Sequence, residues 1–142
     1  MATVNDVPAD KLIEEVSKDL KENFEEIQEP EWSDYVKTAS NKERAPEQRD
    51  WWFTRTAALL RKVYLKQPIG VGRLRKYYGG KDKSESTPEH FQKGSGSIIR
   101  TSLQQLEEAG LVTKSPEGRK ITSEGRSYLD QSSSKLYNKV VE

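Results

Sequence analysis

Lysine and arginine side chains crowd the middle of this 142-residue sequence. Residues 51–100 hold 11 Lys/Arg but only three Asp/Glu, although the whole chain has a formal net charge of +1. Residues 1–50 show the opposite balance, with 14 acidic and seven basic residues. Arginine can bind two phosphate oxygens at once, and lysine supplies a mobile positive charge. The middle third therefore favours a polyanionic partner.

Aromatic side chains accompany these cations and could stack on unpaired bases. Trp51, Tyr77 and Tyr78 have this potential, although Tyr78 fits a core position better, as does Trp52. The predicted nucleic-acid contacts are Trp51, Arg55, Arg61, Lys62, Lys66, Arg73, Arg75, Lys76, Tyr77, Lys81, Lys83, Lys93 and Arg100. For any single one of them, the alternative is an ordinary solvated cation or a core aromatic residue.

Enzymatic chemistry finds little support in the sequence. Gly70 and Gly72 open the stretch GVGRLR, but arginine stands where a dinucleotide fingerprint needs its third glycine, and no GxxxxGK[ST] motif occurs. His90 lacks a nucleophile-elbow pattern and suits a surface or capping position in a loop. Glu107 and Glu108 point about 100° apart on a helix, which indicates a solvated pair. We predict no enzymatic activity, metal site, cofactor or small-molecule substrate.

Composition limits the class of protein further. The chain has no cysteine and one histidine, which excludes disulfides and multi-histidine metal sites. Its longest apolar run, residues 57–60, is far too short to span a membrane, and its N-terminus lacks a signal pattern. Hydrophobic residues make up 32% of the chain, so we expect one soluble cytoplasmic domain with a thin helical core and no membrane partner.

Apolar periodicity predicts the elements that position these residues. A first helix should cover about residues 8–23, with its acidic side chains mostly solvated. A stronger helix should cover residues 50–66, with Asp50 as its N-cap. Its core-facing side should comprise Trp52, Phe53, Thr56, Leu60, Val63 and Tyr64. Its opposite side should carry Trp51, Arg55, Arg61, Lys62 and Lys66. We therefore expect Trp52→Ala to damage folding and Trp51→Ala to damage mainly nucleic-acid binding.

Shorter segments surround the strong helix. Residues 31–37 should form a short helix and residues 38–48 a loop. Another short helix should cover residues 71–78 and end at the glycine pair 79–80. Residues 81–97 are predicted to be a turn-rich loop, interrupted by at most one helical turn at residues 87–89.

The C-terminal part predicts a helix over residues 97–110, with Ser95 or Ser97 as N-cap and Gly110 as its stop. Its inward residues should be Ile99, Leu103 and Leu106. LVTKS and RKIT should then pair as a β-hairpin, and a last helix should bury Tyr128, Leu129 and Leu136.

The predicted elements follow the order helix, turn, helix, hairpin, helix, which is the order found in a winged helix. We predict a mainly α fold: a helical domain around a central amphipathic helix, with a winged-helix-like core and a small hairpin wing. Residues 1–49 should form an acidic helical part, residues 50–131 the basic core, and residues 132–142 the end of the last helix. Residues 97–109 would occupy the position of the recognition helix.

Several stretches resemble the small-subunit ribosomal proteins numbered nineteen in the eukaryotic scheme, a family of archaea and eukaryotes. They are VPADKLI, PEWSDYVKT, KERAPEQRDWWFTRTAALLRKVYL, GVGRLRKYYGG, PEHFQKGSGSIIRTSLQQLEEAGLV and GRKITSEGRSYLD, in matching order over nearly the whole chain. The chain looks closer to the archaeal form, because it lacks the lysine-rich tail usual in eukaryotic members. The resemblance implies a mostly helical protein with a winged-helix-like core, bound to ribosomal RNA in the head of the small subunit.

The resemblance also implies a role in small-subunit assembly, maturation and translation. Trp51, Arg55, Arg61 and Arg100 match positions that the family uses for assembly, as does the loop after Gly80. Expected partners are ribosomal RNA and neighbouring proteins of the subunit head, with a monomer away from the ribosome. Residues 70–83, GVGRLRKYYGGKDK, are expected to dock on RNA, where their cations would replace condensed counterions.

Two other functions remain open from the sequence. A winged-helix DNA-binding transcription regulator is the first, because LVTKSPEGRKITSEGR also suits that class's wing. Such a protein should concentrate cations and amides on its recognition helix, whereas residues 97–109 carry Arg100 together with Glu107 and Glu108. The second is a protein–protein module that uses the acidic first helix.

Overall fold

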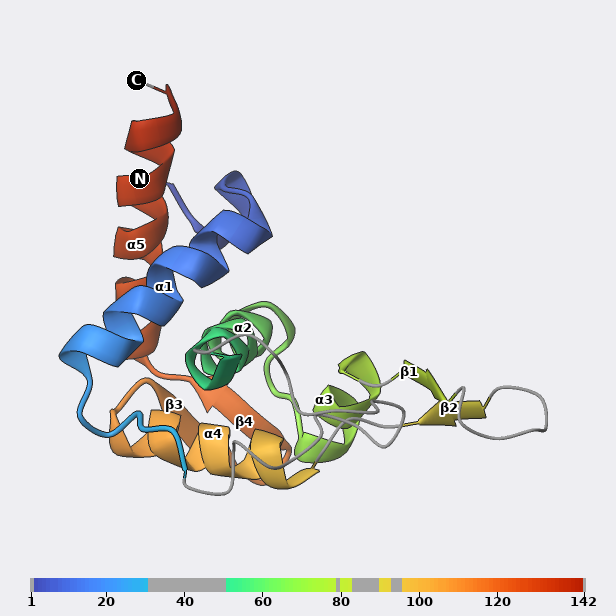
Figure 1. Ribbon diagram of the computed structural model, residues 1–142. Coiled ribbons are helices and arrows are strands. Elements are labelled where there is room, and N and C mark those ends of the chain that lie inside the picture. Colours follow the sequence, from blue (N-terminus) through green and yellow to red (C-terminus); the bar gives the residue numbers. More distant parts are fainter. Residues whose placement is uncertain (1, 31–50, 79, 83–89, 93–95, 142) are drawn as a thin grey trace.

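A computed structural model describes residues 2–30, 51–78, 80–82, 90–92 and 96–141 of the chain (Figure 1). Five helices are present in these residues: α1 (Ala9–Asn23), α2 (Trp51–Lys66), α3 (Val71–Tyr77), α4 (Gly96–Glu108) and α5 (Ser123–Val141). Two antiparallel hairpins accompany them, β1 (Gly80–Asp82) with β2 (His90–Gln92) and β3 (Val112–Ser115) with β4 (Gly118–Ile121). A 3-10 turn, Val4–Asp6, precedes α1. The predicted mainly α fold with a hairpin wing is confirmed.

Helix α1 forms because apolar residues recur every four positions. Leu12, Val16 and Leu20 are all buried, and their stripe packs against α2. Pro8 occupies the N-cap position, where its missing N–H leaves no hydrogen bond unmade. The predicted helix over residues 8–23 is confirmed.

A polar contact joins α1 to α5, far apart in the sequence. The Tyr128 hydroxyl donates a hydrogen bond to an Asp19 carboxylate oxygen at 2.5 Å, and the Phe24 ring packs edge-on against the Tyr128 ring. Burial, reinforced by the neighbouring Asp19 carboxylate, raises the pKa of Tyr128 well above its usual range. Asp19 is therefore a structural acceptor rather than a solvated acid. Leu129 and Leu136 face inward as predicted.

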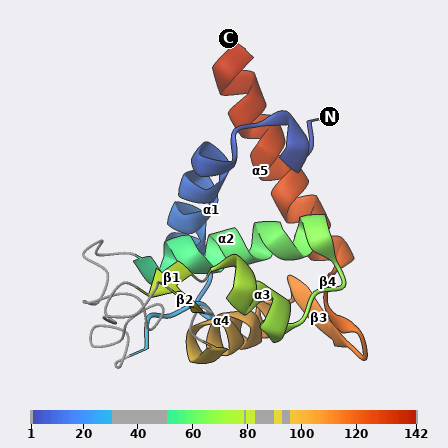
Figure 2. The ribbon, with the colours of Figure 1, turned by 90° about the vertical axis from the view of Figure 1, so that its right-hand side faces the viewer.

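Helix α2 lies between α1 on one side and α3 and α4 on the other, in both ribbon views (Figures 1 and 2). Its predicted core residues Trp52, Phe53, Thr56, Leu60 and Val63 are buried, with Tyr64 partly buried, and the helix also buries Ala57 and Leu59. Asp50, like the short helix and loop predicted for residues 31–48, lies outside the described residues.

The placement of Trp51 on an exposed side of α2 is wrong. Only 6% of Trp51 is exposed, and its ring packs edge-on against Trp52 and alongside Ile98 of α4. A helix that packs on two sides buries more than the single apolar face that its periodicity defines. The Trp51 indole is therefore not available for stacking on a nucleic-acid base, contrary to the prediction from the sequence.

The winged-helix-like part consists of α3, α4, α5 and the β3–β4 hairpin. Gly110 has a φ of +82°, and the Leu111 N–H donates to the Leu106 carbonyl, so α4 stops at Gly110 as predicted. Ser97 lies inside α4 rather than at its cap, and Ser95 lies outside the described residues. Ile69 forms a two-way β-bridge with Arg119, which joins the segment before α3 to the wing.

The predicted loop over residues 81–97 contains a hairpin that the sequence pattern missed. Lys81 pairs with Phe91 and Asp82 pairs with His90, so His90 stands in a strand and not in a loop. Each of these strands has three residues, too few to display an alternating pattern. The single turn predicted at residues 87–89 lies outside the described residues.

Replacing either Trp51 or Trp52 with alanine should destabilise the fold. Trp52 is fully buried and its indole N–H donates to Gln105 Oε1 at 3.0 Å, while Trp51 packs against it. Loss of a buried indole costs about 3–5 kcal/mol. Thermal melts of the two variants would measure this, and a Trp51→Ala protein that melts like the unmodified chain would contradict the burial.

Gly125→Ala should weaken the packing of α5 on the wing. A methyl group at Gly125 would lie 2.1 Å from the Leu111 carbonyl oxygen, so α5 would have to move. Overpacking of this kind costs about 1–3 kcal/mol. The control is Gly72→Ala in α3, where nothing lies within 4 Å and a gain of about 0.4–1 kcal/mol is expected. Urea unfolding of both variants should give opposite signs, and equal stabilities would overturn the contact.

Candidate nucleic-acid interface

Two cations of α2 meet two consecutive tyrosines at the end of α3. Arg55 and Lys62 are seven positions apart, which places them on the same side of the helix after about two turns. The Arg55 Cζ atom lies 4.3 Å from the Tyr78 ring centroid, and the Lys62 Nζ atom lies 4.4 Å from the Tyr77 ring centroid. Cation–π attraction therefore holds α3 against α2 at the centre of the basic sequence.

Two arginine side chains of α2, Arg55 and Arg61, have nitrogen atoms that are shielded from water. Burial lowers the pKa of Arg55 and raises the pKa of Tyr78, while the positive charges of Arg55 and Arg61 oppose the rise at Tyr78. Arg55 Nη1 and Arg61 Nε are buried and have no hydrogen-bond partner among the described residues. An unpartnered buried donor is unfavourable, so these arginines are poorly explained by stability alone.

The cations of α2 differ in exposure, which the sequence did not distinguish. Arg55, Arg61 and Lys62 are each partly buried against α3, whereas Lys66 at the helix end is exposed. Of the predicted row of free cations, Arg55 and Lys62 are therefore held in place by aromatic rings, whereas Lys66 is open to solvent.

Helix α3 presents its cations in two directions. Arg73, Lys76 and Tyr77 are exposed, and their spacing of three and four positions places them together on one face. They line a shallow hollow of about 330 Å³. Arg75 is only partly exposed and turns toward the start of α4: a methyl group at Gly96 would lie 3.4 Å from Arg75 Cδ and 3.3 Å from Arg100 Nη2.

The structure therefore gathers cations from three elements that are separated in the sequence. We call this set the basic surface, and it comprises Arg55, Arg61, Lys62, Arg73, Arg75, Lys76 and Arg100. Of the other predicted contacts, Trp51 is buried, Tyr77 adjoins the basic surface, Lys66 ends α2 and Lys81 lies in β1. Lys83 and Lys93 lie outside the described residues.

Helix α4, in the position of a recognition helix, is occupied with internal contacts. Gln105 accepts from the Trp52 indole N–H and donates from Nε2 to the Gln28 carbonyl at 2.8 Å. Glu107 forms a short ion pair with Arg119 of the wing. The sequence did not reveal these contacts, because Gln28 stands 77 residues from Gln105 and carries no periodic signal.

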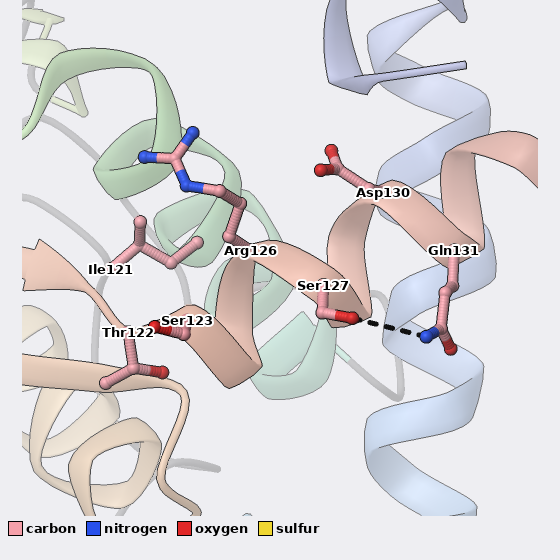
Figure 3. Close-up of a pocket in the computed structure, with 7 residues that line it drawn as sticks. All are labelled: Ile121, Thr122, Ser123, Arg126, Ser127, Asp130 and Gln131. Atoms are coloured by element: carbon pink, nitrogen blue, oxygen red, sulfur yellow. Dashed lines mark hydrogen bonds between the residues drawn. The ribbon is translucent and has the colours of Figure 1, made fainter. Parts of the chain in front are cut away.

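A second hollow, of about 400 Å³, lies at the start of α5 (Figure 3). Asp130 accepts the Tyr64 hydroxyl at 2.7 Å, and the Arg126 guanidinium lies 5.1 Å from the Tyr64 ring centroid. Thr122 Oγ1 donates to the Gly110 carbonyl and accepts from the Gly125 N–H. Because its polar groups already serve the fold, this hollow is a weaker candidate than the basic surface.

Within the described ranges, no cluster of three or more acidic, histidine or cysteine side chains is arranged to hold a metal ion. None of the helices in the described part of the chain is long and apolar enough to cross a membrane.

Comparison with known proteins matches the chain to one family over most of its length. The model of the family described as ribosomal protein S19e matches residues 3–139. Proteins named small ribosomal subunit protein eS19 are similar to the chain in both archaea and a plant. The Aeropyrum pernix protein is 46% identical over 99% of this chain and 94% of its own length.

The Haloarcula marismortui protein is 45% identical over 96% of this chain and 92% of its own length. The protein from Oryza sativa subsp. japonica is 47% identical over 91% of this chain and 88% of its own length. The family implied by the sequence resemblance is confirmed: this chain belongs to the ribosomal protein S19e family, whose members are structural ribosomal proteins rather than enzymes.

Proposed function

We propose that this protein binds ribosomal RNA in the head of the small subunit through the basic surface, and that this binding supports subunit assembly and translation. Membership of the family makes the protein a structural component of the small subunit of cytoplasmic ribosomes. The observation that supports RNA contact is the convergence of cations from α2, α3 and the start of α4, two of which have buried N–H groups without a partner in the part of the chain that the structure describes.

Electrostatics favours this part of the molecule for RNA. Helices α2 and α3 contain seven Lys/Arg residues and no Asp or Glu. Arg55 and Lys62 are held against rings, so binding requires less ordering of these two side chains than freely mobile ones would need. Phosphate oxygens could accept from guanidinium groups such as those of Arg73 and Arg100, which are exposed.

The acidic helix α1 lies on the other side of α2, away from the basic surface (Figures 1 and 2). Its exposed Glu14 and Glu22 would repel phosphate. We therefore assign α1 to solvent or to basic neighbouring proteins of the subunit rather than to RNA.

A DNA-reading winged helix fits the contacts less well. Such a protein would read bases with side chains of α4 and its wing. Gln105 and Arg119, two of the side chains suited to that role, are engaged with Trp52, Gln28 and Glu107.

Neutralising the basic surface should weaken RNA binding and reduce its dependence on salt. Combining Arg73→Gln, Lys76→Gln and Arg100→Gln removes three exposed charges. The slope of log affinity against log salt should become shallower by about 2–3 units, at roughly 0.7–0.9 per lost phosphate contact. The measurement is a salt titration on small-subunit ribosomal RNA fragments, with thermal melts to verify an intact fold.

The matched control removes the same charge elsewhere. Lys114, Lys120 and Lys135 are also exposed, on the wing and α5, and their combined change to glutamine should leave the slope nearly unaltered. Equal losses in both triple variants would indicate nonspecific attraction. A larger loss in the control variant, measured on duplex DNA, would favour the regulator instead.

The same two triple variants can be followed into ribosomes. In cells that express tagged forms, the unmodified protein and the control variant should sediment with small subunits on a sucrose gradient. The variant lacking Arg73, Lys76 and Arg100 should shift toward the free fractions, because it has lost phosphate contacts. An unmodified protein found wholly in the free fractions would refute the proposed function.

A further inference from the structure

Of the aromatic residues beside the basic sequence, only one has an accessible ring in the described residues. Trp51 is covered by Trp52 and Ile98, and Tyr78 is covered by the Arg55 guanidinium. Tyr77 has 46% of its surface exposed. What distinguishes Tyr77 from an ordinary exposed aromatic residue is its position beside the basic surface, in the hollow that Arg73 and Lys76 also line.

The surroundings of Tyr77 are those of a base-stacking site. The Lys62 Nζ atom lies 4.4 Å from the ring centroid and holds one face of the ring. Nearly half of the Tyr77 surface, 46%, stays open to solvent despite this contact, so a flat ligand can reach the residue. Arg73 and Lys76 line the same hollow as Tyr77 and bring positive charge to its edge.

We propose that Tyr77 is the platform on which one unpaired RNA base stacks, with Arg73 and Lys76 binding the phosphates on either side of that nucleotide. This inference rests on the proposed function and narrows it from RNA in general to an RNA segment with an unpaired base. A base inside a duplex is stacked on its neighbours and offers no free face, whereas a loop or bulge does.

A protein neighbour is a less suitable occupant of this site. The three cations around Tyr77, which are Lys62, Arg73 and Lys76, favour a polyanion over an apolar or basic protein surface. A nucleotide suits this arrangement, since its base can stack on the tyrosine while the backbone phosphates on either side meet the cations.

The test compares two probes, a short single-stranded RNA and a fully paired duplex of the same strand, bound by the full-length chain. Tyr77→Ala should weaken binding of the single strand by about 5- to 150-fold, the usual effect of losing one stacking contact. Binding of the duplex and the salt dependence on both probes should stay unchanged. Tyr77→Trp keeps a stacking ring and should restore single-strand affinity.

Tyr137 supplies the matched control. It lies on α5, outside the basic surface, and has a similar exposure of 43%, so Tyr137→Ala should alter neither affinity. Equal losses on both probes, or no loss on either, would overturn the platform while leaving the proposed RNA binding in place. If Tyr77→Ala kept its RNA affinity but no longer co-sedimented with ribosomal proteins, Tyr77 would be assigned to a protein contact instead. Failure of the unmodified chain to bind either RNA would refute the proposed function itself.

Discussion

The burial of α2 on two sides is the constraint on which the rest of the molecule depends. Leu59 and Leu60 are both fully buried although they point about 100° apart, because α1 packs on one side and α4 on another. A helix enclosed in this way has little surface left for solvent. Four charged residues of α2 remain, Arg55, Arg61, Lys62 and Lys66, and three of them, Arg55, Lys62 and Lys66, lie within about 40° of one another around the helix. Packing thus concentrates positive charge along one line of the fold.

Helix α3 turns this line of charge into a surface with defined geometry. Its two terminal tyrosines face Arg55 and Lys62, and its Leu74 is fully buried beneath them. The same short helix sends Arg75 toward Arg100. Because rings hold Arg55 and Lys62, the positions of these two charges are largely established before any ligand arrives. The buried donors of Arg55 and Arg61 that lack a partner among the described residues add little to the stability of the isolated chain, which is consistent with the proposed role in RNA binding.

The sequence predicts the helices well, because each carries an apolar stripe of the right period, such as Leu12, Val16 and Leu20 in α1. The predicted wing and the end of α4 at Gly110 are confirmed for a different reason: turns depend on the residue types at a few neighbouring positions. Burial of Trp51 could not be predicted from one helical face, because it depends on Ile98 of a distant helix. The roles of Gln105 and of Tyr77 depend equally on partners from other elements. The cations were recognisable by type, whereas their separation into covered and open side chains required the fold.

Arg119 has a consequence for the mechanics of recognition. Its backbone forms a bridge with Ile69 before α3, and its guanidinium pairs with Glu107 at the end of α4. One residue of the wing therefore fastens both helices that carry the outer cations. The spacing between Arg73 and Arg100 thus depends on contacts of the wing that neither residue makes itself. In the proposed complex, RNA would meet charges whose spacing is set by the wing, a part of the protein outside the proposed contact.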